Sequence, residues 1–187
     1  MTRFVDRGAI VAAYVGIGMA VVIAISFLLV IPIEPVYWFL APLAGLLIGY
    51  YANSRSDRRA GPWGRILVNG LFAGVVTAVT IVVLLLAVKA LFFVADDGYR
   101  DASVGPPLSC TSGAGCVYAR YLDLPDGPAK LAGQGVTNVA TFTTFYWNQQ
   151  LATAETLLVV TIAGALGGAV LYGLARPKNR PEPRVLA

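Results

Sequence analysis

The sequence has 187 residues, of which 57% are hydrophobic and 13% are charged, and its formal net charge is +4. Soluble globular domains carry charges at about a quarter of their positions, so this composition excludes an ordinary soluble protein. The sequence contains no histidine, which excludes an imidazole base, a Ser-His-Asp triad and histidine-ligated metals. We therefore expect no enzyme activity, no metal site and no cofactor.

The first charge-free run covers residues 8–33 and follows the short basic stretch MTRFVDR at 1–7. It is longer than the apolar core of about 7 to 15 residues found in secretory signals, and no small-residue cleavage motif separates it from Pro32 and Glu34. About 20 apolar residues are enough for a helix to cross a bilayer. We predict a retained membrane-spanning helix over 8–33.

The second run, VYWFLAPLAGLLIGYYA, is shorter and predicts a span over 36–52. Pro42 removes one backbone hydrogen bond in its first half. Neighbouring helices commonly compensate for such a proline inside a membrane, which favours a kinked span over a re-entrant loop. A turn at 33–35 joins this span to the first, and an arginine-rich segment at 53–65 follows it.

Two further runs predict spans over 66–94 and 155–175, and a proline-rich basic tail at 176–187, for which we expect disorder, follows the last one. The predicted fold is an all-α integral membrane protein with four transmembrane helices packed as a bundle. Each span carries small residues that would let helix backbones approach closely. The glycines among them are Gly16, Gly45, Gly49, Gly70, Gly74, Gly164 and Gly168.

Most of the 14 basic residues fall in three segments, 1–7, 53–65 and 176–187, which four spans place on one side of the membrane. Lysine and arginine in short loops remain cytoplasmic, so both termini are predicted to be cytoplasmic in a bacterial plasma membrane. These arginines lack interleaved stacking aromatics, which argues against nucleic-acid binding and favours attraction to anionic lipid headgroups.

Cys110 and Cys116, in the stretch CTSGAGC, are the only cysteines of the chain. They lie in the predicted extracytoplasmic loop, 95–154, where oxidising conditions favour a disulfide. A zinc site needs more ligands, and a redox CxxC motif has two intervening residues where this stretch has five. We predict a structural disulfide. A bond that responds to the redox state outside the cell is the alternative hypothesis.

The same loop is rich in aromatic residues and predicts a short amphipathic helix before the turn PDGP. Its last part is predicted to form an interfacial helix or an outer extension of the fourth span. Alternatively, its aromatics form a recognition surface for a partner or an apolar ligand. That surface would comprise Tyr118, Tyr121, Phe142, Phe145, Tyr146 and Trp147.

Ionisable residues are nearly absent from the predicted spans. Lys89, close to the end of the third span, is expected to extend toward the headgroups, or to pair with Glu155 at the outer end of the fourth span. The sequence thus favours a non-catalytic accessory or scaffold subunit that uses its outer loop to bind a protein partner or further copies of itself. A small transporter, channel component or carrier of an apolar ligand, using Asn69, Thr77 and Thr80, is the alternative.

Overall fold

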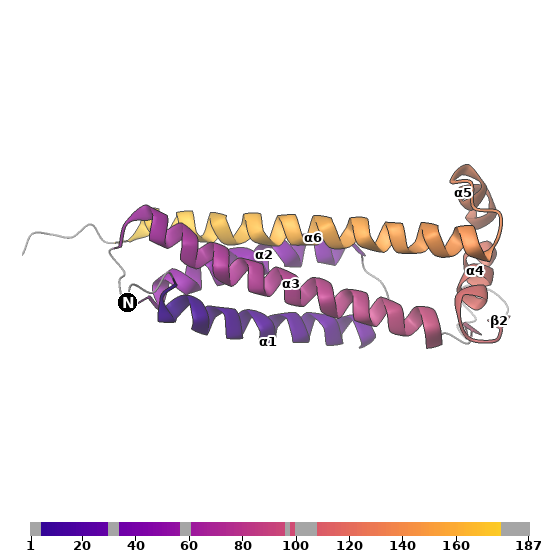
Figure 1. The fold of residues 1–187 in the computed structure, drawn as a ribbon, viewed down its shortest axis with the longest axis horizontal. Coiled ribbons are helices and arrows are strands. Elements are labelled where there is room, and N and C mark those ends of the chain that lie inside the picture. The colour runs from indigo at the N-terminus through magenta and orange to yellow at the C-terminus, as the bar shows by residue number, and fades with distance from the viewer. Residues whose placement is uncertain (1–4, 30–33, 57–60, 96–97, 100–107, 177–187) are drawn as a thin grey trace, which may run out of the picture. The chain divides into compact units, whose positions relative to one another are not determined.

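The computed structural model describes residues 5–29, 34–56, 61–95, 98–99 and 108–176. These residues form α1 (Arg7–Leu29), α2 (Glu34–Ser54), α3 (Trp63–Ala95), β1 (Gly98–Tyr99), β2 (Leu108–Ser109), α4 (Ala114–Asp123), α5 (Gly127–Gly133) and α6 (Val139–Ala175) (Figure 1). The two short strands pair antiparallel, and the rest of the regular structure is helical. Residues 30–33 of the first predicted span and turn, part of the arginine-rich segment, and the tail after Arg176 lie outside the described residues.

Three helices are long and apolar enough to cross a membrane, among the residues that the structure describes. They are α1 up to Ile25, α3 and α6. These helices correspond to the first, third and fourth apolar runs of the sequence. The second run forms α2, a helix of 21 residues with Pro42 in its interior.

The chain divides into two compact units, which we call unit 1 (1–82 and 156–187) and unit 2 (83–155). Unit 1 contains α1, α2, the first part of α3 and the last part of α6. Unit 2 contains the remaining parts of α3 and α6 together with α4, α5 and the two strands.

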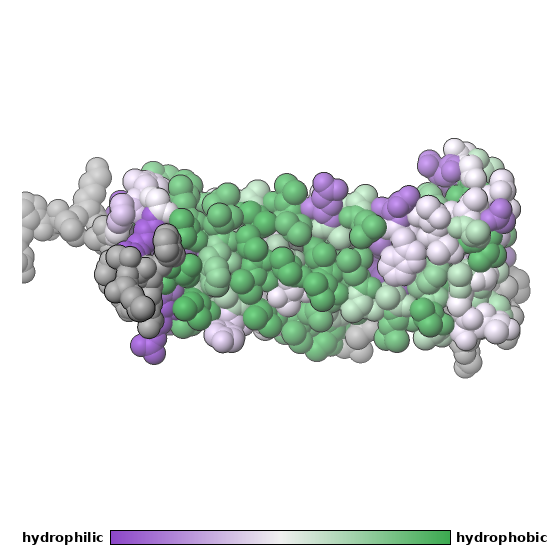
Figure 2. All heavy atoms as spheres, in the orientation of Figure 1, coloured by the Kyte–Doolittle hydropathy of each residue, from purple (hydrophilic) through white to green (hydrophobic). Residues whose placement is uncertain are grey.

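Unit 1 carries small and polar side chains inside and large apolar side chains outside. Alanines of α1, α2, α3 and α6 are buried, whereas Tyr14 is 72% exposed and Leu174 is 71% exposed. Figure 2 shows hydrophobic residues covering the helical surface of one face, with hydrophilic residues gathered at the end of unit 1 where α1 begins. The buried polar residues of unit 1 are Asp6, Asn53, Ser56, Asn69, Thr77 and Thr161. A water-soluble helical domain has the opposite distribution.

Glycines allow the helices of unit 1 to pack with little space between them. On α2, a Cβ added to Gly45 or Gly49 would collide with the α6 backbone at Thr161 or Ala165. From the α6 side, a Cβ on Gly164 would likewise meet the backbone of α2. Backbones in this proximity gain dispersion energy over a long contact, which is how helices associate without a hydrophobic driving force.

Helix α3 uses its glycines in the same way. A Cβ on Gly70 or Gly74 would meet the side chain of Ala169 or Ala165 on α6. On α1, a Cβ at Gly16 would collide with the hydroxyl of Thr77 on α3. Each glycine that the sequence predicts for helix packing therefore lies at a contact between two helices.

Helix α6 begins at Val139, well before residue 155 where the sequence places the start of the fourth span. A capping box explains the early start: the Asn138 side-chain oxygen accepts a hydrogen bond from the Thr141 N–H (3.0 Å), and the Thr141 hydroxyl accepts one from the Asn138 N–H (3.1 Å). The Thr143 hydroxyl then donates to the Val139 carbonyl in the first turns. Residues 139–154, predicted to form either an interfacial helix or an extension of the last predicted span, thus form one continuous helix with that apolar run.

Candidate functional site

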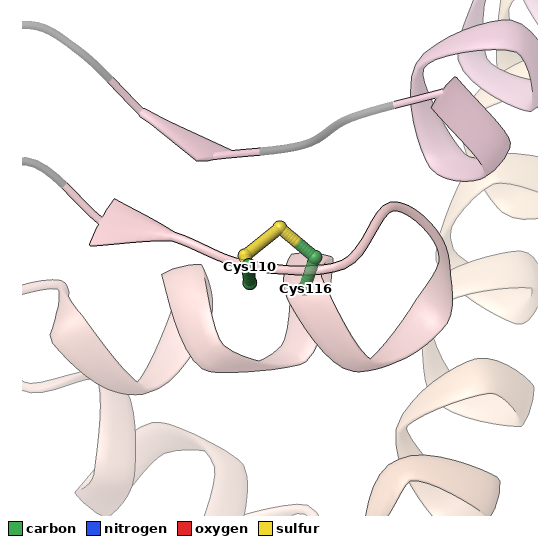
Figure 3. Close-up of a disulfide and its surroundings, with 2 residues drawn as sticks. All are labelled: Cys110 and Cys116. Carbon is green, nitrogen blue, oxygen red and sulfur yellow. A yellow bond between two sulfur atoms is a disulfide. The ribbon is translucent and has the colours of Figure 1, made fainter.

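The predicted disulfide is confirmed and lies in unit 2. Cys110 directly follows β2 and is bonded to Cys116 in the first turn of α4, with 5.4 Å between the Cα atoms (Figure 3). Gly113 precedes α4 with a φ of 121°, a conformation that favours glycine, and its carbonyl accepts hydrogen bonds from Cys116 and Val117. The bond therefore fixes the short β ladder to the start of α4.

Phe142 lies at the centre of the aromatic residues that the sequence proposes as a surface. It is 0% exposed, and its ring centroid lies 5.2 Å from that of Tyr118, 5.0 Å from Tyr121, 6.4 Å from Phe145 and 6.1 Å from Tyr146. Aromatic pairs at these separations attract each other through their ring edges and faces. Helices α4 and α6 are thereby joined by contacts between rings.

A second group of rings adds the end of α3 to this cluster. The Phe93 centroid lies 4.7 Å from that of Tyr146 and 5.4 Å from that of Trp147. Val117, Leu131 and Val136 are the other buried members of this cluster. Phe142 and Tyr146 are buried in this core and so cannot belong to an exposed recognition surface. The other four predicted aromatics are only partly buried, and their contact with a partner stays a prediction.

Sequence reasoning missed a polar cluster at the end of unit 1 where α1 begins, which we call the Asp6 cluster (Asp6, Ser56, Arg65 and Asn69). Asp6 immediately precedes α1, Ser56 follows α2, and the other two residues lie in the first turns of α3. Asp6 Oδ2 accepts hydrogen bonds from the Ser56 hydroxyl (2.7 Å) and from Asn69 Nδ2 (3.1 Å). Asp6 Oδ1 lies 3.0 Å from Arg65 Nε.

The main chain takes part in the same cluster. The Asp6 N–H donates to the Asn69 side-chain oxygen at 3.2 Å, and the Asp6 carbonyl accepts from the N–H groups of Ala9 and Ile10. Nearby, the Asn53 side chain donates to the carbonyls of Gly49 and Ile66, at 3.0 Å each, and so joins α2 to α3.

The Asp6 carboxylate thus lies against a guanidinium, a hydroxyl and an amide in a buried place. The cluster fixes the ends of three helices to one another, and this geometry suits a structural role. The sequence contains one sign of the cluster, because Asp6 is an acidic residue within the basic segment 1–7.

The hydroxyls that the sequence proposes as a transport lining donate within their own helix. The Thr77 hydroxyl donates to the Ala73 carbonyl (2.9 Å), and the Thr80 hydroxyl donates to the Val76 carbonyl (2.8 Å). Lys89 is half-buried and Glu155 is exposed in unit 2. Asp6 and Arg65 form an ion pair in unit 1, whereas the pairing of Lys89 with Glu155 stays a prediction.

The disulfide, the Asp6 cluster and the aromatic rings around Phe142 and Phe93, which we call the ring cluster, each join separate segments of the described chain. Comparison with protein-family models, with curated proteins and with solved structures finds no match to this chain.

Proposed function

We propose that this chain is a non-catalytic integral membrane protein with four spanning helices, which serves as an accessory or scaffold subunit of a membrane complex. Its extracytoplasmic unit 2 binds the protein partner. The observation that carries the proposal is the distribution of side chains in unit 1, where large apolar residues are exposed and small or polar residues are buried. Such a surface matches lipid chains, whereas water would drive it to associate.

Helix lengths support four spans. About 20 residues of α3 and about 20 of α6 belong to unit 1, which is the length that crosses a hydrocarbon core of about 30 Å. Helix α2 has 21 residues and packs on both α1 and α6 through backbone contacts at Gly8 and Gly164. A helix enclosed in this way by two spanning neighbours is in a suitable place to be the fourth span.

Charge supports the orientation. Arg7 and Arg65 lie in the first turns of α1 and α3, and Arg55 and Arg176 directly follow α2 and α6. Contacts between these segments bring the four arginines to one end of unit 1. Arginine concentrates on the cytoplasmic side of bacterial membranes, which favours the cytoplasm for this end and the outside for the loop that carries the disulfide.

Unit 2 has features of a docking module. Its core is aromatic and a disulfide fixes the start of α4, so unit 2 can hold a defined shape outside the membrane. It also exposes Leu122 and Leu124 next to the partly buried Tyr121. Rigid aromatic and apolar side chains are enriched at protein interfaces.

The experiment that tests the proposal is site-specific photo-crosslinking in the native host. A photo-reactive amino acid replaces Leu124 in unit 2 or, as the matched control, Leu174 in unit 1, both of which are exposed. We expect the position of Leu124 to crosslink to one protein in stoichiometric amount, which also migrates with the chain on a native gel, and the position of Leu174 to crosslink to lipid. A partner captured only from the Leu174 position would refute docking through unit 2.

A labelling experiment tests the orientation. Lys130 is exposed in unit 2, and Arg55 is exposed just after α2. Each is replaced by cysteine in turn while the native disulfide is kept. A membrane-impermeant maleimide added to intact cells should label Lys130→Cys only. Labelling of Arg55→Cys alone would reverse the proposed topology, and labelling of both in intact cells would contradict a membrane crossing by α3, the helix between the two positions.

A further inference from the structure

Arg176, at the end of α6, has two contacts in unit 1. Its Nη1 atom donates a hydrogen bond to the Gly61 carbonyl, and its guanidinium carbon lies 5.6 Å from the centroid of the Trp63 ring. The guanidinium thus lies over an aromatic face at a distance typical of a cation–π interaction.

The Trp63 ring is itself held against α6. A Cβ added to Gly173 would collide with the six-membered ring of Trp63, so the ring lies directly on the helix backbone. Gly173 and Arg176 are three residues apart and share one face of α6. One helix face therefore supplies both the support for the ring and the cation above it, and Trp63 remains 42% exposed.

Neither Arg176 nor Arg55 lies within 4.0 Å of a carboxylate among the described residues. Arg55 lies over the ring of Tyr51, 5.5 Å from its centroid, at the same end of unit 1. Stacking uses the face of a guanidinium, so the N–H donors of Arg176 that are not bonded to Gly61 remain at its edge. A planar fork of such donors fits the oxygens of a phosphate.

We propose that Arg176 and Trp63 form a binding site for the phosphate group of an anionic phospholipid in the adjacent leaflet, which we call the Arg176 site. The apolar side chains beside it argue for a lipid. Leu171 and Leu174 precede Arg176 on α6, are exposed, and would lie along the acyl chains. An exposed tryptophan at the end of a spanning helix is typical of the headgroup level. The Arg55 and Tyr51 pair adds positive charge at the same level.

This site deepens the proposed function and rests on its membrane-spanning unit 1. Phosphate-binding chemistry could equally serve a soluble phosphate ester, so the test must distinguish the two sources. It uses the full-length chain purified in nanodiscs, with phosphatidylcholine alone or with added phosphatidylglycerol. Native mass spectrometry counts the bound phosphatidylglycerol, and titration gives its apparent affinity.

Three variants separate the site from general charge. R176K keeps the charge but loses the planar fork, and we expect it to weaken phosphatidylglycerol binding about tenfold. R7Q removes an exposed arginine at the same end and should cost no more than about fivefold, the effect of one charge near an anionic surface. W63L should weaken binding as R176K does, and it provides the test if R176K fails to fold.

Phosphatidylglycerol binding that is weakened about tenfold in R176K and W63L, but no more than about fivefold in R7Q, supports the site. An R176K affinity equal to that of the wild type would overturn it. Competition by glycerol phosphate at the same concentration would also overturn it, because a soluble ester would then be the ligand. Failure of the chain to enter nanodiscs at all would instead count against the membrane-spanning proposal.

Discussion

Replacing Asp6 by alanine tests the Asp6 cluster most directly. The change removes the carboxylate that Arg65 Nε approaches to 3.0 Å, and with it the acceptor for the Ser56 hydroxyl and for the Asn69 amide. Two neutral donors and one cation then lose their contact with this carboxylate in a place where water has little access. We expect the free energy of unfolding of the protein in mixed micelles to fall by about 2 to 4 kcal/mol.

The size of this effect follows from burial. Breaking a fully buried ion pair by removing one partner costs about 3 to 5 kcal/mol, because the remaining charge is left uncompensated. The side chain of Asp6 is 10% exposed but that of Arg65 is 22% exposed, so the guanidinium can recover part of its hydration. This recovery lowers the expected loss to about 2 to 4 kcal/mol, and each unsatisfied donor contributes to it.

The assay is reversible unfolding by sodium dodecyl sulfate, followed by far-ultraviolet circular dichroism. A double-mutant cycle with Arg65→Gln should give a coupling free energy of about 1 to 3 kcal/mol, because the two residues share one network. The matched control is Arg7→Ala, an exposed residue next in the chain, which should change stability by less than about 0.5 kcal/mol. A loss below about 0.5 kcal/mol for Asp6→Ala would refute the structural role of the cluster.

The remaining predictions concern helix packing and unit 2. Gly49→Ala should destabilise unit 1 by about 1 to 3 kcal/mol, because its Cβ would collide with the α6 backbone, whereas Gly18→Ala, with nothing within 4 Å, should be neutral or stabilising in the same unfolding assay. Phe142→Ala should cost about 3 to 5 kcal/mol, measured as increased protease cleavage within unit 2, since the residue is wholly buried. Replacing both Cys110 and Cys116 by serine should cost about 2 kcal/mol, detected as faster hydrogen exchange in α4 but not in α1.

Helices α1, α2 and α3 were predictable because hydropathy and length are properties of contiguous residues. The disulfide was predictable for a similar reason, since Cys110 and Cys116 are the only two cysteines and glycine lies between them. The start of α6 was not predictable in this way. Threonine has a low helix propensity, and the capping box at Asn138 and Thr141 determines where this helix starts.

The Asp6 cluster and the ring cluster depend on contacts between distant residues. Asp6 meets Asn69 across 63 positions, and no periodicity in the sequence links them. The spacing of Phe142, Phe145 and Tyr146 places them on one helix face, but an interfacial belt and a domain core have the same pattern. Only the position of α4 against α6 distinguishes the two, and it places the rings in a core.

Chain order gives the Asp6 cluster a consequence for biosynthesis. The contact of Asp6 with Ser56 spans 50 residues and is available once α2 has left the ribosome, whereas the contacts with Arg65 and Asn69 await α3. A hairpin of α1 and α2 can therefore form first, and the guanidinium completes it when the third helix arrives. A chain interrupted before α3 lacks that cation beside the Asp6 carboxylate. Membrane quality-control proteases would thus have a chemical difference by which to tell unfinished chains from complete ones.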